Sequence, residues 1–189
     1  MNGNSARPDK SPSDCRGFWQ SVTADCYAFS NNTGLVRSLL LNPPTQLLFQ
    51  YRLAQFLRAY GAIGRYISRL LKIRLLKVFG CDISLQSTIE PGTIFPHPVG
   101  IVIGENVFIS TGCRIFQNVT IGRRNFRYPT APRLEVGVVV YPGSVIVGDC
   151  TVGENAVVGA NCFIDHDLPA GSKLCAPRAL IMPKGQANA

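Results

Sequence analysis

Between residues 83 and 168, an aliphatic or aromatic residue returns at every sixth position. Two extra residues lengthen the repeat before Ile103, and an irregular segment interrupts it after Ile121. The first positions of the hexads are Ile83, Ile89, Phe95, Ile103, Ile109, Ile115, Ile121, Leu134, Val140, Ile146, Val152, Val158 and Ile164. The fifth positions are small or β-branched apart from Asn125, and they are Ser87, Thr93, Val99, Val107, Cys113, Val119, Val138, Ser144, Cys150, Ala156 and Cys162.

A period of six differs from the 3.6 of a helix and from the two of a half-buried strand. It is typical of a short strand and a turn repeated many times, which is the pattern of a parallel β-helix. Three hexads then form one triangular coil, and each first position points inward onto its counterpart about 4.8 Å away in the next coil. The small fifth position lets the chain turn each corner. An ordinary sandwich of short strands is the alternative fold. Such a sandwich does not require an apolar first position and a small fifth position in so many successive hexads.

A segment with helical periodicity precedes the repeat, so we expect a helical segment at 14–80 and the β-helix at 81–182. Residues 1–13 are polar and we expect a disordered lead, and we expect a mobile tail at 183–189. Within the helical segment the apolar spacing predicts helices at 14–29, 35–41, 45–60 and 62–79, the last two stopped by Gly61 and Gly80.

Composition and charge limit the partners. Apolar residues make up 46% and charged residues 16%, as in a folded globular protein. Residues 1–80 hold 11 Lys and Arg against 3 Asp and Glu, a net charge of +8, whereas residues 81–189 hold 8 of each. No aromatic and basic module for nucleic acid is present, so we expect no nucleic-acid partner. The cations of helix 62–79 surround a wide apolar face, which indicates either a helix packed on its neighbours or one in peripheral contact with a membrane.

The seven cysteines indicate a reducing compartment. Their number is odd and no CxxC pair is present. Three of them, Cys113, Cys150 and Cys162, take the small fifth position, where a thiol acts as a compact apolar filler. The polar start of the chain predicts no signal peptide, and five cations argue against a membrane span at 62–79. We therefore expect a cytoplasmic protein, with the inner face of the membrane as an alternative site for the basic helix.

His97 is one of only two histidines and lies in the hexad that two residues lengthen. A lengthened unit bulges outward, so we expect this side chain on the surface. Asp82, one coil earlier on the same face, is expected to hold the imidazole by its other nitrogen. A histidine oriented by a carboxylate suits general-base catalysis on a hydroxyl, and a merely exposed histidine is the alternative. Two histidines are too few for a zinc site with three histidine ligands, so we expect no metal.

The residues around this pair resemble the serine acetyltransferases and their polysaccharide O-acetyltransferase relatives, a family of hexapeptide-repeat acyltransferases. Asp82 and His97 fall on the catalytic pair of the family's motifs D-I-H-P and H-x-x-G-I-V-I-G-E, with the same spacing. Residues 117–122 resemble the family's Q-x-V-T-L-G, and residues 51–57 its H-R-L-A-H-W-L. The resemblance spans roughly 35–182. It implies a mainly β protein with a left-handed β-helix and a short helical segment before it.

Three departures from the serine enzymes bear on the acceptor. Pro96 stands where they have an Asp, no histidine occurs in 123–133 where their R-H-P motif should fall, and the acidic residue of their helical domain falls near Asn31. In the family these groups serve the zwitterionic amino acid. The resemblance therefore favours a sugar or polysaccharide precursor as the acceptor, and serine O-acetylation in cysteine biosynthesis is the alternative.

The resemblance also implies a mechanism and a partner. His97 would take the proton of the acceptor hydroxyl as it attacks the thioester of acetyl-CoA, and Asp82 would fix the tautomer of the imidazole. Acetyl-CoA in this family lies between adjacent prisms of a trimer, which implies a homotrimer. The candidates for holding it are Gly122, Pro142 and Ala160 by main-chain groups and Lys173 and Arg178 at its phosphates, with plain solvated surface as the alternative for the last two.

The segment 123–130 interrupts the hexads, so we expect it to project over the site as a lid, or else to be an ordinary surface excursion. Arg127 and Tyr128 in it are candidates for binding the acceptor. We expect His166, in the turn after the last hexad, to be structural. Two hypotheses of another class remain, namely a non-catalytic β-helix scaffold and an assembly module recruited to a membrane by the helix 62–79.

Overall fold

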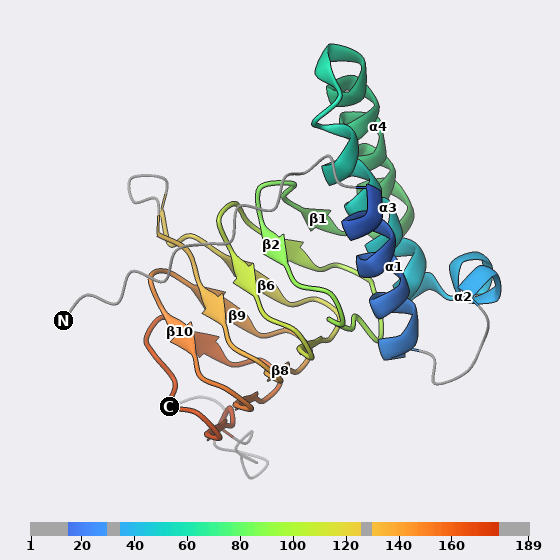
Figure 1. Ribbon diagram of the computed structural model, residues 1–189. Coiled ribbons are helices and arrows are strands. Elements are labelled where there is room, and N and C mark those ends of the chain that lie inside the picture. The colour runs from blue at the N-terminus through green and yellow to red at the C-terminus, as the bar shows by residue number, and fades with distance from the viewer. Residues whose placement is uncertain (1–14, 30–34, 126–129, 178–189) are drawn as a thin grey trace, which may run out of the picture.

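The structure is a computed structural model that describes residues 15–29, 35–125 and 130–177. Four helices come first, α1 (Cys15–Phe29), α2 (Leu35–Leu41), α3 (Pro43–Leu57) and α4 (Gly61–Phe79). Short strands follow, β1 (Asp82–Ile83), β2 (Thr88–Ile89), β3 (Val102–Ile103), β4 (Phe108–Ile109), β5 (Arg114–Ile115), β6 (Thr120–Gly122), β7 (Arg133–Leu134), β8 (Val139–Val140), β9 (Val145–Val147), β10 (Thr151–Val152), β11 (Val157–Val158), β12 (Phe163–Ile164) and β13 (Lys173–Leu174). The helices gather at the end of the coils that holds β1 (Figure 1).

The strands form three parallel sheets, as a triangular β-helix requires. One sheet has the order β1-β3-β6-β9-β12, the second β10-β7-β4-β2 and the third β13-β11-β8-β5. Ile103 pairs with Ile121, and Ile146 with Ile164, so a regular coil takes 18 residues or three hexads. The step from Ile83 to Ile103 is 20 residues, which places the two extra residues in the coil of His97 as predicted.

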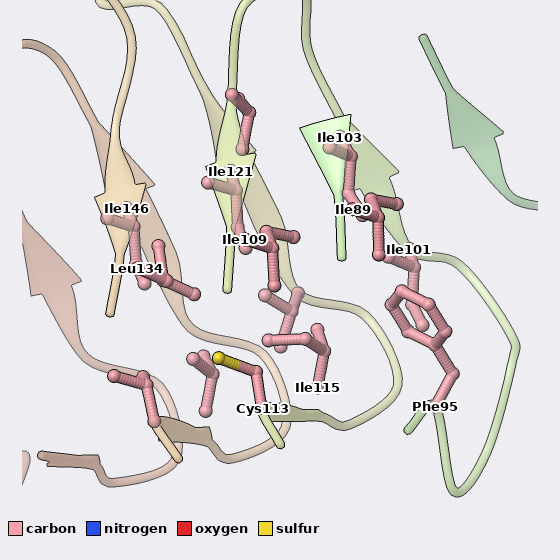
Figure 2. Packing of buried hydrophobic residues seen from close by; sticks show 14 of the residues in the cluster. Ile89, Phe95, Ile101, Ile103, Ile109, Cys113, Ile115, Ile121, Leu134 and Ile146 are labelled. Carbon is pink, nitrogen blue, oxygen red and sulfur yellow. The ribbon is translucent and has the colours of Figure 1, made fainter. Parts of the chain in front are cut away.

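The core confirms the six-residue rule. Each of the thirteen predicted first positions is buried, from Ile83 to Ile164, and the side chains stack in rows along the axis (Figure 2). The small or β-branched fifth positions are buried too, with one exception. Val99 is 58% exposed, because the two extra residues shift the register and Ile101 fills the inward place before Ile103. Val99 therefore does not fill a corner of the core as the other fifth positions do, and the insertion is the reason.

The four predicted helices are present, with two changes at their ends. α3 begins at Pro43 instead of 45, because a proline is compatible with the first turn, where no helical N–H bond is needed. It ends at Leu57, and Gly61, with φ of +61°, is the first residue of α4 instead of the stop of α3. Gly80 ends α4 in the left-handed conformation, and its N–H donates to the Leu76 carbonyl at 3.0 Å.

A buried ion pair joins the helices to the first coil. Arg52 of α3 donates to Asp25 of α1 through Nε at 2.5 Å and Nη2 at 3.1 Å, and both side chains are buried. Arg52 Nη1 also donates to the Ile89 carbonyl at 3.1 Å, and the N–H of Gly92 donates to Asp25 at 2.9 Å. Next to them the Tyr51 hydroxyl donates to the Ser87 carbonyl at 2.8 Å. The helical segment is thus fixed on the coil that carries His97.

The seven cysteines are free thiols, five buried and two, Cys15 and Cys175, exposed. Across the described ranges of the chain, none of the helices has the length and apolar content needed to cross a membrane.

Candidate active site

His97 lies in the turn that leads from the third sheet to the first, and its side chain is exposed as predicted. The turn begins after Phe95, which is buried, and it is closed by a 2.8 Å bond from the N–H of Val99 to the His97 carbonyl. The two extra residues of the first coil therefore push the imidazole outward while the chain re-enters the core at Ile101. We call this edge of the prism, between the third and first sheets, the His97 corner.

Aromatic rings from the next two coils continue the His97 corner. The imidazole lies 6.3 Å from the ring of Phe116, which is stacked on Tyr141 with centroids 5.1 Å apart and planes 6° from parallel. Offset or tilted contacts of this kind are favourable for aromatic rings. The imidazole of His97 makes no hydrogen bond to any described residue, so both ring nitrogens can meet a substrate.

The backbone under these rings is built from glycines stacked on asparagines. Gly100 and Gly143 have φ of +66° and +72°, and the asparagines one coil further, Asn118 and Asn161, also have positive φ. A Cβ on either glycine would come within 2.2 Å of the asparagine Oδ1. Glycine suits these positions because it adopts positive φ without strain and leaves room for the asparagine side chain of the next coil.

Asp82 opens β1, one strand before β3, but its carboxylate is not bonded to His97. Oδ1 of Asp82 lies 3.0 Å from Nζ of Lys72 in α4. Among the described residues, none forms a hydrogen-bonded bridge between Asp82 and the imidazole of His97. The structure thus shows no bond within the predicted pair, and the Asp82 carboxylate lies against an ammonium group of the helical segment instead. Lys72 had no signal in the sequence beyond its charge.

The candidates for holding acetyl-CoA are divided between two edges of the first sheet. Pro142 and Ala160 lie at the His97 corner, in the turns before β9 and β12. Gly122 ends β6 at the far edge of the same sheet, and Lys173 is exposed in β13 of the third sheet. Arg178 and the acceptor candidates Arg127 and Tyr128 lie outside the described residues.

Ion pairs hold the start of the segment predicted as a lid. Arg123 lies 2.7 Å from Glu105, which comes from the preceding coil, and Arg124 lies 3.1 Å from Asp165, which comes from two coils further on. This segment leaves the prism at the edge of Gly122, opposite the His97 corner. His166 is exposed, with Nδ1 3.3 Å from Oδ1 of Asp165, at the same edge.

Sequence reasoning missed Asp25 and gave Gln117 no role. Asp25 is a buried acid on the packed side of α1. The sequence feature that could have revealed it is an acidic residue on the same side of the helix as the buried Val22 and Cys26. Oε1 of Gln117, in the turn after Phe116, is buried and makes no hydrogen bond within the described residues.

Over the same residues, no group of three or more His, Cys, Asp or Glu side chains is placed to hold a metal ion.

Comparison with known proteins finds serine acetyltransferases among the relatives of the chain. No family model matches the chain. It is 34% identical over 149 residues to a serine acetyltransferase of Helicobacter pylori, covering 77% of this chain and 85% of the relative. Serine acetyltransferase 2 of Arabidopsis thaliana is 28% identical over 162 residues, covering 83% of this chain and 50% of the relative.

Solved structures agree. Serine acetyltransferase isoform 3 of Entamoeba histolytica, in complex with cysteine, superposes with a TM-score of 0.76 at 26% identity, over 90% of this chain and 62% of that one. The soybean serine acetyltransferase apoenzyme gives 0.75 at 26% identity, over 91% and 70%. This chain thus spans less than two thirds of the Entamoeba enzyme.

The chain belongs to the serine acetyltransferase family of hexapeptide-repeat acyltransferases, and its parallel β-helix is left-handed. The resemblance seen in the sequence is therefore confirmed, and so is the acyltransferase class. Our preference for a sugar acceptor finds no support, because the matched relatives are named serine acetyltransferases. The alternative, serine, is the better supported one.

Proposed function

We propose that this protein transfers the acetyl group of acetyl-CoA to the hydroxyl of serine, with His97 as the general base. The observation that carries the proposal is the exposed imidazole at the His97 corner, free of hydrogen bonds within the described residues and held on a turn between rigid strands. The family of the chain supports the reaction class, and the names of its relatives support the acceptor.

The proposed chemistry needs one base and one orienting carboxylate. A ring nitrogen of His97 takes the hydroxyl proton while the oxygen attacks the thioester carbonyl, and the C–S bond then breaks. The imidazolium returns its proton to the departing thiolate, so the products are the acetyl ester and free CoA. A carboxylate near the ring stabilises the imidazolium, and we assign this role to Asp82. Asp82 would have to exchange its contact with Lys72 for one with the imidazole during turnover.

The division of the acetyl-CoA candidates supports a site shared between protomers. Pro142 and Ala160 lie at the His97 corner, whereas Gly122 lies across the first sheet. A neighbouring prism that presents its far edge to this corner would bring both sets to one groove. We therefore propose a homotrimer with acetyl-CoA between adjacent prisms, and we keep Lys173 and Arg178 as candidates for its phosphates and Arg127 and Tyr128 for the acceptor.

One observation keeps a sugar as a second candidate. The stacked rings of Phe116 and Tyr141 beside His97 form an aromatic surface, and the electron-rich faces of such rings attract the weakly positive C–H groups of a sugar. A zwitterionic amino acid gains less from such a surface than from charged groups.

The test is a thiol-release assay with purified full-length protein, acetyl-CoA and either serine or a panel of sugars and nucleotide sugars. We expect free CoA to appear with serine at a kcat/KM at least tenfold above that for any sugar. If free CoA appears with a sugar but not with serine, the acceptor is that sugar, and the proposal of acyl transfer still holds. No binding of acetyl-CoA in calorimetry would overturn both and favour a non-catalytic scaffold.

A further inference from the structure

We propose that the outward side of α4 docks on an anionic membrane surface. This side, which we call the outer face of α4, carries Ile63, Tyr66, Ile67, Leu70 and Ile73. All five side chains are exposed, Ile63 by 77% and Tyr66 by 63%. Their spacing of three, one, three and three residues places them on one side of a helix. The proposal does not depend on the acetyl-transfer reaction.

The fold itself leaves this side uncovered. α4 packs on α3 through the opposite side, which carries Gly64, Ser68, Leu75 and Phe79. Ser68 donates to the Ala54 carbonyl at 2.7 Å, and a Cβ on Gly64 would come within 2.1 Å of the Leu57 carbonyl oxygen. The close packing fixes the rotation of α4 about its axis. Figure 1 shows that α3 and α4 extend together past the edge of the coils, so the prism does not cover the outer face.

The charge of α4 selects the partner. The helix contains Arg65, Arg69, Lys72, Arg74 and Lys77 and no acidic residue. Lys72 is paired with Asp82. The other cations have aliphatic stems that can lie along the apolar side chains while their charged ends reach lipid phosphates. With 3.6 residues per turn, Arg65 and Arg69 lie beside the outer face, and Arg74 and Lys77 lie within its C-terminal part. An apolar face accompanied by cations is the arrangement by which a helix lies in the plane of a membrane interface.

A second copy of the chain fits this face less well. Two outer faces in contact would bring together two sets of cations with no carboxylate on either helix, and like charges at an interface oppose association. Anionic lipid headgroups have the complementary charge, and the net charge of residues 1–80 adds to the attraction. The number and sign of these charges therefore favour lipid over a copy of the same helix.

The experiment is vesicle flotation of the full-length protein. The vesicles are phosphatidylcholine alone or phosphatidylcholine with about 30% phosphatidylglycerol, a content that gives a clearly negative surface. We expect binding to the anionic vesicles only, weakened at least tenfold by high salt because the ions screen the attraction.

Two double variants divide the contributions. Arg65→Glu with Arg69→Glu reverses charge beside the outer face, and Ile63→Asn with Leu70→Asn removes its apolar contact. We expect each to weaken vesicle binding at least tenfold with an unchanged melting temperature, because all four side chains are exposed. The control, Arg114→Glu with Arg133→Glu, reverses two cations of the β-helix and should keep binding within about twofold.

Failure of the wild type to float, or equal losses in the control and in the α4 charge variant, would overturn the proposal. Sedimentation velocity tests the other occupant. If Ile63→Asn with Leu70→Asn lowers the oligomeric state of a protein that does not bind vesicles, the outer face is an interface between copies and the membrane proposal is wrong.

Discussion

The ammonium of Lys72 lies 3.0 Å from the carboxylate of Asp82, so the last helix before the β-helix touches the residue that we propose to orient His97. Both side chains are partly exposed. The contact makes α4 part of the surroundings of the site, although Lys72 lies outside the motifs that carry the resemblance.

Lys72→Gln tests what this contact does to turnover. An exposed ion pair contributes up to about 1 kcal/mol, which corresponds to roughly a fivefold change in an equilibrium. Removing the ammonium frees Asp82 to face the imidazole, so we expect kcat to rise up to about fivefold with little change in melting temperature. Lys77→Gln on the same helix is the control and should leave kcat unchanged. A fall in kcat for Lys72→Gln would mean that the ammonium itself assists the reaction.

The buried pair of Asp25 and Arg52 should be a point of large loss. Arg52→Met leaves the Asp25 carboxylate buried with the N–H of Gly92 as its one remaining donor among the described residues, and breaking a buried pair costs about 3–5 kcal/mol. We expect this loss in urea denaturation. The exposed Arg58, which donates to the Leu85 carbonyl, is the control, and Arg58→Met should cost less than about 1 kcal/mol.

If the double variant Asp25→Leu with Arg52→Met recovers most of the stability, the loss came from the unpaired charge. An Arg52→Met protein as stable as the wild type would show that the pair does not form as described.

Gly143 should resist replacement more strongly than Gly171. Both have positive φ, so alanine costs roughly 1–2 kcal/mol of backbone strain at either. Only at Gly143 would the new Cβ also meet Asn161 Oδ1 at 2.2 Å, since nothing lies within 4 Å at Gly171. We expect Gly143→Ala to be less stable than Gly171→Ala by more than about 1 kcal/mol in thermal unfolding. Equal losses would contradict the close stacking at the His97 corner.

Stability should fall at alkaline pH in two stages. Burial raises the pKa of Cys113 from 9.0 to about 11 and the pKa of Tyr51 from 10.0 to about 12. A raised pKa means that the folded state holds its proton more tightly than the unfolded chain. The stabilisation is therefore complete below the unfolded value and is lost as the pH rises through the interval, first for the thiol and then for the phenol.

Two pKa units at Tyr51 correspond to about 3 kcal/mol. Tyr51→Phe should remove the loss between pH 10 and 12 while lowering stability at pH 7 by about 1 kcal/mol, because the bond to the Ser87 carbonyl is lost. Unfolding free energies from urea titrations at several pH values check this. A wild type whose stability is flat from pH 9 to 12 would contradict the burial of both groups.

The fold was predictable because one rule repeats over thirteen hexads, which make more than four coils of the β-helix. Each first position from Ile83 to Ile164 must be apolar to stack inside a narrow prism, so the pattern states the architecture directly. Val99 escaped the rule because an insertion changes register without changing composition. The end of α3 at Leu57 was missed because Gly61 is equally suited to begin a helix in the left-handed conformation.

The site was only partly predictable, for a different reason. The spacing of Asp82 and His97 placed them one coil apart on the same side of the prism, but which partner takes a carboxylate depends on side chains from elsewhere in the chain. Lys72 and the pair of Asp25 and Arg52 come from helices whose docking no periodicity reports. The identity of the acceptor is harder to predict, because the candidate residues at 127 and 128 lie in the segment that interrupts the hexads, where the repeat gives no information on position.

The most direct test of the central claim is the turnover of His97→Asn with acetyl-CoA and serine. Asparagine keeps a polar side chain of similar reach on the same exposed turn but cannot take a proton. We expect kcat to fall on the order of 100-fold or more, with unchanged melting temperature and unchanged affinity for acetyl-CoA. A variant that keeps more than about a tenth of the wild-type kcat would contradict the role of His97 as the general base.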